Sequence, residues 1–95
     1  MDAEDAIKKI IFRHLSPKEY QIFLFGSRAV GKNQRFSDFD VGVLGPNEIP
    51  AGKLSLIEEE LENSDVPYKV DVVDFYRVRP EFKKVALRHA KLWTI

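Results

Sequence analysis

Two stretches of the chain carry the residue types that could do chemistry. Residues 26–40, GSRAVGKNQRFSDFD, join a Gly-Ser pair to the carboxylates of Asp38 and Asp40. A third carboxylate, Asp71, lies downstream in KVDVVDF. Close carboxylates repel one another and destabilise a fold unless a cation lies between them. Oxygen ligands suit Mg²⁺ or Mn²⁺, and Mg²⁺ keeps substrate phosphates among its own ligands, so converging aspartates predict a nucleotide site.

The glycine and the serine suit the phosphate side of such a site. Gly26 lets a phosphate approach the backbone closely, because it has no side chain. Ser27 offers a hydroxyl and a backbone N–H at the start of a helical turn, where anions are favoured. Two ions about 3.5–4 Å apart would hold the attacking and leaving oxygens of an in-line phosphoryl displacement.

The elements that must position these residues follow from the apolar spacing. Helices are predicted over residues 3–14, over residues 54–61 and from Pro80 onward, and strands over residues 20–25, 39–45 and 68–75. The C-terminal LWTI forms either a short edge strand or a packed end. A helix of about four turns between the second and third strands favours a parallel pair, and the short link between the first two favours an antiparallel pair. The expected fold class is α/β (α+β): a small mixed sheet with helices packed on it.

This topology brings the three carboxylates to one edge of the sheet. The first strand ends at the Gly-Ser pair, and an antiparallel second strand begins at that edge with Asp38 and Asp40, which face one side. A parallel third strand also begins there, with Asp71 near its start. Asp74 is expected on the opposite side, as a solvated or capping residue.

Size and composition narrow the class of protein. The chain has 95 residues, so one domain over residues 1–95 is expected. Lys+Arg and Asp+Glu both number 15, and the zero net charge argues against nucleic acid as the main partner. The absence of cysteine excludes disulfides and thiolate metal sites. No apolar run reaches membrane-spanning length and the N-terminus lacks a signal-peptide pattern, so a cytoplasmic protein is expected.

The pattern of a Gly-Ser pair, ten residues and then Asp-x-Asp resembles the signature of the DNA polymerase β-like nucleotidyltransferase superfamily. The third carboxylate, Asp71, on a later strand resembles it too. The chain length and the final helix after Arg79-Pro80 are similar to the minimal nucleotidyltransferases (MNT). The resemblance covers nearly the whole chain and implies a nucleotidyltransferase-like fold.

The resemblance also implies roles for individual residues. Gly26 and Ser27 would hold the β- and γ-phosphates of a nucleoside triphosphate, with ATP as the expected substrate. Asp38 and Asp40 would hold two Mg²⁺ ions. Asp71 would hold the catalytic ion and help to activate the acceptor hydroxyl.

The loop between these residues carries a basic side chain and one departure from the family pattern. Arg28 matches a position that is often basic in the minimal members and is expected to bind nucleotide phosphate. Val30 stands where relatives often carry arginine, which weakens the case for a doubly basic phosphate loop. Residues 32–36 are expected to be a mobile spacer over the site.

The implied reaction is transfer of a nucleoside monophosphate, AMP being favoured, to an acceptor hydroxyl with release of pyrophosphate. Minimal members of this size often pair with a HEPN-domain protein. In such pairs the nucleotidyltransferase resembles an antitoxin that adenylylates a tyrosine of its toxic ribonuclease partner. The sequence leaves open whether two copies share a site, as a homo-oligomer, or a mixed complex forms.

Two other functions compete with this one. A non-catalytic protein could neutralise its partner by contact alone, using the basic face of Lys84, Arg88 and Lys91. A small-molecule nucleotidyltransferase of the aminoglycoside type is less favoured, because those enzymes carry a further domain for the acceptor.

The remaining conspicuous side chains have structural explanations. An apolar stripe on the last helix is predicted from Phe82, Val85, Ala86 and His89. His14 and Trp93 are expected to be packed or interface residues.

Overall fold

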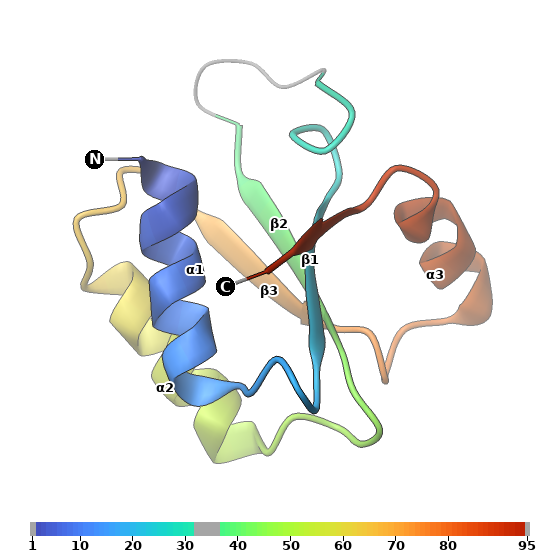
Figure 1. The fold of residues 1–95 in the computed structure, drawn as a ribbon, viewed down its shortest axis with the longest axis horizontal. Coiled ribbons are helices and arrows are strands. Elements are labelled where there is room, and N and C mark those ends of the chain that lie inside the picture. The colour runs from blue at the N-terminus through green and yellow to red at the C-terminus, as the bar shows by residue number, and fades with distance from the viewer. Residues whose placement is uncertain (1, 32–36, 95) are drawn as a thin grey trace.

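The computed structural model describes residues 2–31 and 37–94. The spacer expected over residues 32–36 therefore lies outside the described residues. The elements follow one another as α1 (Ala3–His14), β1 (Gln21–Phe25), β2 (Phe39–Leu44), α2 (Ala51–Glu62), β3 (Val70–Asp74), α3 (Pro80–Leu87) and β4 (Lys91–Trp93) (Figure 1). No helix within the described ranges has the length and apolarity that crossing a membrane requires.

The four strands form one mixed sheet in the order β3-β2-β1-β4. β1 pairs antiparallel with β2, and β2 pairs parallel with β3. Both pairings confirm the prediction from connection lengths. The C-terminal segment is the edge strand β4, which pairs antiparallel with β1.

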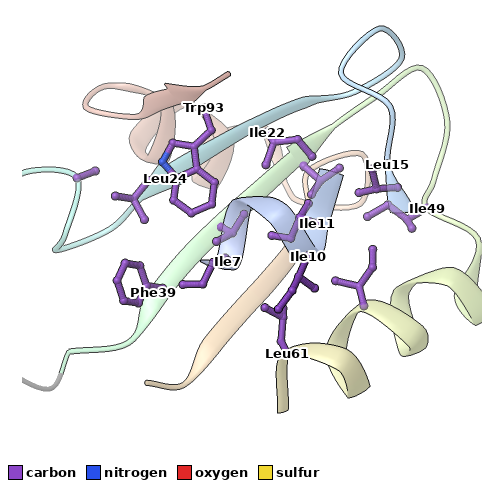
Figure 2. Close-up of a cluster of buried hydrophobic side chains, with 14 residues drawn as sticks. Ile7, Ile10, Ile11, Leu15, Ile22, Leu24, Phe39, Ile49, Leu61 and Trp93 are labelled. Atoms are coloured by element: carbon purple, nitrogen blue, oxygen red, sulfur yellow. The ribbon is translucent and has the colours of Figure 1, made fainter. Parts of the chain in front are cut away.

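One face of the sheet is covered by α1 and α2. Alternate residues of β1 and β2, among them Leu24 and Val41, point into this core and meet Ile7 and Ile11 of α1 (Figure 2). Trp93 of β4 is buried in the same core, as a packed residue. The helices are also joined at the surface, because Arg13 of α1 forms an ion pair with Glu60 of α2 and the His14 ring hydrogen-bonds to the same carboxylate.

The opposite face carries an aromatic cluster of Phe23, Phe25 and Phe75. Phe75 lies edge-on to Phe23 and Phe25, with ring centroids 4.8 and 5.1 Å apart. Gly42 makes room for these rings, since a Cβ there would come within 2.8 Å of the Phe75 ring. The α3 helix meets this cluster through Phe82, whose ring centroid is 5.7 Å from that of Phe75.

The predicted apolar stripe of α3 is wrong as a buried stripe. Phe82 and Val85 are 46% and 62% exposed, and none of the residues of α3 is buried. The helix ends at Leu87, so His89 lies in the turn beyond it and is exposed. A helix of eight residues meets the small aromatic cluster along one line only, which leaves the rest of its apolar side chains in solvent.

Asp74 points to the side opposite Asp71, as predicted, and it is a buried capping residue. Its Oδ2 accepts the backbone N–H of Ile49 at 2.9 Å, and its Oδ1 accepts that of Tyr76 at 3.0 Å. The carboxylate therefore joins the end of β3 to the loop before α2.

Candidate functional site

Two aspartates occupy neighbouring places in one row across the sheet. In the strand register Phe25 of β1 lies beside Asp40 of β2, and Asp40 lies beside Asp71 of β3. Directly paired residues share a face, so both carboxylates stand on the side of the aromatic cluster. Asp38 precedes Asp40 by two residues and adds a third carboxylate at the same edge. The register thus confirms that Asp40 and Asp71 lie side by side, and a site formed by all three carboxylates stays a prediction.

The charges at this edge act on one another. Burial raises the pKa of Asp40 above its ordinary value, and the negative charges of Asp71 and Asp38 raise that pKa further. The positive charge of Lys69 opposes them. The ionised form of Asp40 is therefore disfavoured, first by burial and then by its acidic neighbours.

Gly26 lies directly against the carboxylate of Asp40. The backbone of Gly26 has φ 76°, in the left-handed region that favours glycine. A Cβ at this position would overlap the Asp40 carboxylate, with Cγ only 3.2 Å away. The backbone N–H of Ala29 bonds to the Gly26 carbonyl at 3.1 Å, which closes a turn containing Ser27. Gly26 therefore borders Asp40, and Ser27 follows it in the same turn.

Lys69 is a charged residue of this site that the sequence motif does not contain. Its Nζ lies 3.8 Å from Oδ1 of Asp71, and both side chains are substantially exposed. The only signal in the sequence is spacing: residues 69 and 71 of an extended chain face the same side. Residues two apart occur throughout every strand. This spacing alone therefore does not identify Lys69 as a neighbour of Asp71, and the strand register is needed.

The structure places Arg28 against two aromatic rings. Its guanidinium carbon lies 4.0 Å from the ring centroid of Phe39 and 4.7 Å from that of Tyr68. Its Nε donates a hydrogen bond of 2.9 Å to the carbonyl of Ser37. Phe39 belongs to the core under α1 and α2, so Arg28 points to that side of the sheet. Its role as a phosphate ligand stays a prediction, and its contacts hold the residue that precedes Asp38.

The three carboxylates suit a divalent cation in their chemistry, because they offer the oxygen ligands that Mg²⁺ prefers. Burial and then the charges of Asp71 and Asp38 raise the pKa of Asp40, and a cation among the carboxylates would offset this repulsion. Across residues 2–31 and 37–94, no three or more His, Asp or Glu side chains are gathered closely enough to enclose an ion. Metal binding by Asp38, Asp40 and Asp71 therefore stays a prediction.

Comparison with known proteins adds a family and several close folds. Residues 5–93 match the model of the nucleotidyltransferase domain family. The chain is 30% identical over 82 residues to a protein of Haemophilus influenzae named as probable protein adenylyltransferase MntA, a match covering 86% of this chain and 71% of that protein.

Two solved structures show the same fold in complexes. A chain of a toxin–antitoxin complex with AMP-PNP superimposes with a TM-score of 0.74 at 26% identity, covering all of this chain and 75% of that one. A chain from the complex of tri-AMPylated Shewanella oneidensis HEPN toxin with MNT antitoxin gives a TM-score of 0.70 at 23% identity, covering 98% of this chain and 71% of that one. Of these three similar proteins, one is named as a probable protein adenylyltransferase, one belongs to a complex with AMP-PNP, and one belongs to a complex with an AMPylated HEPN toxin.

Proposed function

The chain belongs to the nucleotidyltransferase domain family, and we propose that it transfers AMP from ATP to a hydroxyl of a HEPN-domain partner, as the antitoxin of a toxin–antitoxin pair. The name of the Haemophilus influenzae relative supports a protein as the acceptor. The complexes with AMP-PNP and with an AMPylated HEPN toxin support ATP as the donor and such a toxin as the partner.

The observation that carries the proposal is the row formed by Asp40 and Asp71, with Gly26 against Asp40. Gly26 adds no side chain of its own to this edge, and the Asp40 carboxylate occupies the space where such a side chain would stand. The adjacent carboxylates supply the oxygen ligands that Mg²⁺ prefers. Donor phosphates and cation sites therefore share one edge of the sheet.

The residues have distinct roles in the proposed reaction. Asp38, Asp40 and Asp71 would hold Mg²⁺, which when bound offsets the charge of the phosphate oxygens and favours ionisation of the acceptor hydroxyl. Gly26 and Ser27 hold the outer phosphates through backbone N–H groups and the serine hydroxyl. These contacts orient the α-phosphorus toward the acceptor.

The reaction balances without any further reactant. The acceptor oxygen forms a bond to the α-phosphorus, and the bond from that phosphorus to pyrophosphate breaks. The hydroxyl proton leaves through Asp71, whose side chain is 44% exposed and can pass it to solvent. The products are the AMP-modified acceptor, pyrophosphate and a proton.

A labelling experiment tests the function. The protein is incubated with α-labelled ATP, Mg²⁺ and the HEPN-domain protein encoded by the neighbouring gene, and label on the partner is measured. Asp38→Asn and Asp40→Asn are expected to lower the rate by on the order of 100-fold or more, as loss of charge stabilisation does. Asp5→Asn, an equal charge change at an exposed position of α1, is the control and is expected to act like the wild type. No label on the partner with the wild type would refute the proposal.

A second function, neutralisation by contact alone, is favoured by the surface of α3. Exposed Phe82 and Val85 lie on a helix that also carries Lys84, with Arg88 exposed directly after it. Under this alternative, Asp40→Asn still protects cells from the partner, whereas Lys84→Glu/Arg88→Glu does not. The opposite pattern excludes it.

A further inference from the structure

One edge of the sheet next to the aspartates is open. β3 is the terminal strand of the sheet, and within the described residues no strand pairs with its outer side (Figure 1). The carbonyl of Lys69 accepts the N–H of Phe39, and the N–H of Phe75 bonds to the carbonyl of Val43. Backbone groups of successive strand residues point to alternate sides, so residues 69, 71, 73 and 75 face β2.

The residues between them face outward. The N–H and C=O groups of Val70 and Val72 point away from β2. Within the described part of the chain, no other backbone segment forms hydrogen bonds with them. Such a row of free donors and acceptors is a template for one more strand. Extended peptides commonly bind by adding a strand to an open edge.

The register fixes where a side chain of an added strand would stand. Phe25, Asp40 and Asp71 form one row across β1, β2 and β3. On a strand added at β3, the residue opposite Asp71 extends this row by one place, about 5 Å beyond Asp71 and on the same face. A hydroxyl on that residue is delivered to the carboxylates without any rearrangement of the sheet.

The surface beside this edge selects the charge of the incoming strand. A groove of about 400 Å³ runs between the start of β3 and the end of α2. Its charged lining residues are Glu58, Glu62, Lys69 and Asp71, three acidic and one basic. Val66 and Tyr68 add apolar wall. A basic segment with apolar side chains complements this lining.

We propose that the acceptor is an extended, basic segment of the partner protein, which adds to the outer edge of β3 and places its hydroxyl residue opposite Asp71. The inference rests on the proposed function for the identity of the acceptor. The docking is nevertheless measurable without catalysis.

Hydrogen exchange of a non-catalytic complex tests the docking directly. The Asp40→Asn protein is mixed with the neighbouring HEPN-domain protein, and amide exchange is followed residue by residue. The amides of Val70 and Val72 are expected to exchange at least about tenfold more slowly in the complex than in the free chain. Unchanged exchange at both amides in a formed complex, or failure to form a complex, overturns the proposal.

A proline substitution isolates the backbone contribution. Val70→Pro removes an outward N–H at the first residue of an edge strand, where proline is tolerated. Val70→Ala is the matched control, because it shortens the same side chain and keeps the N–H. We expect Val70→Pro to lower kcat/KM for the acceptor at least about tenfold relative to Val70→Ala, with the affinity for Mg²⁺-ATP unchanged. Equal kcat/KM for the two variants overturns the edge pairing.

Charge reversal tests the groove. Glu58→Lys and Glu62→Lys are expected to raise the KM for the acceptor several-fold, whereas Glu59→Lys, on the same helix but outside the groove, is expected to leave it unchanged. Equal effects of all three reversals contradict a basic segment in the groove. Protected Val70 and Val72 amides without any transfer of label would leave the docking intact and refute the enzymatic function instead.

Discussion

The carboxylate of Asp40 lies against the backbone of Gly26, with Cγ 3.2 Å from the point where a side chain on Gly26 would begin. The turn that follows β1 and the strand that carries the central aspartate are therefore fitted to each other. A left-handed φ of 76° and a lack of space both demand glycine at this position.

Gly26 and Gly31 both have a left-handed backbone conformation. Comparing their alanine variants separates the effect of backbone strain from the effect of disturbing Asp40. Gly31 has φ 74°, and nothing lies within 4 Å of the point where its Cβ would stand. Gly31→Ala is expected to lose about 1–2 kcal/mol of stability from backbone strain, and Gly26→Ala at least as much, because its Cβ would also overlap Asp40. Only Gly26→Ala is expected to weaken Mg²⁺-ATP binding, by about tenfold or more, because it displaces Asp40. Calorimetric titration measures this, and equal ATP affinity of the two variants would contradict it.

The stability of the metal-free protein is expected to depend on the charge of Asp40. Its pKa in the folded protein is raised above 3.8 by burial, Asp71 and Asp38, so the folded state binds its proton more tightly than the unfolded state. Ionised Asp40 therefore destabilises the fold above the folded pKa, and this destabilisation disappears below 3.8. Asp40→Asn should raise the Tm at pH 7 in EDTA.

The same pair of proteins gives the control. The Tm difference between Asp40→Asn and wild type should shrink as the pH falls toward 3.8, where Asp40 becomes neutral in both states. Added Mg²⁺ with ATP should raise the Tm of the wild type more than that of the variant. A lower Tm for Asp40→Asn at pH 7 without metal would show that its charge is not under repulsion.

Asp74 is expected to matter for stability alone. Asp74→Ala leaves the backbone N–H groups of Ile49 and Tyr76 without their acceptor, at a cost of about 2–3 kcal/mol. Urea unfolding measures this cost, and Asp65→Ala at an exposed position should stay within about 0.5 kcal/mol of the wild type. The fraction of Asp74→Ala protein that stays folded should bind Mg²⁺-ATP with the affinity of the wild type. A loss of ATP affinity in that folded fraction would place Asp74 in the nucleotide site.

Arg28 is expected to act through the segment before Asp38. Arg28→Lys loses the stacked guanidinium plane on Phe39 and Tyr68, and Tyr68→Leu loses one ring of that stack. Each is expected to lower stability by about 1–2 kcal/mol. Their affinities for Mg²⁺-ATP should lie within about twofold of each other. A much weaker affinity for Arg28→Lys alone would place the guanidinium on a nucleotide phosphate.

The strand pairing could be predicted because few arrangements satisfy the connection lengths. A short link after β1 permits an antiparallel neighbour, and the helix between β2 and β3 permits a parallel one. Those two facts place Asp40 and Asp71 at the same edge of the sheet, and the register of the structure pairs them directly. The strand topology therefore predicts which aspartates share an edge, without any information on side-chain packing.

Side-chain partners from distant segments could not be predicted in the same way. Asp74 is buried because the loop at Ile49 packs over it. The residue pattern of β3 cannot predict this burial, because the loop belongs to a distant segment of the chain. Val85 has the spacing of a buried residue but is 62% exposed, since α3 has little surface to pack on. Arg28 turns to the rings of Phe39 and Tyr68, a choice decided by tertiary contacts.

The alternation of β3 has a genetic consequence. Asp71 and Asp74 stand three residues apart on opposite faces of one strand, one beside Asp40 and one bound to two backbone amides. In a screen for inactive mutants, changes at either position would score alike. A second-site suppressor that stabilises the whole domain should restore Asp74 mutants, because their defect is in folding, and should fail with Asp71 mutants, so suppressibility would separate the two faces of the strand.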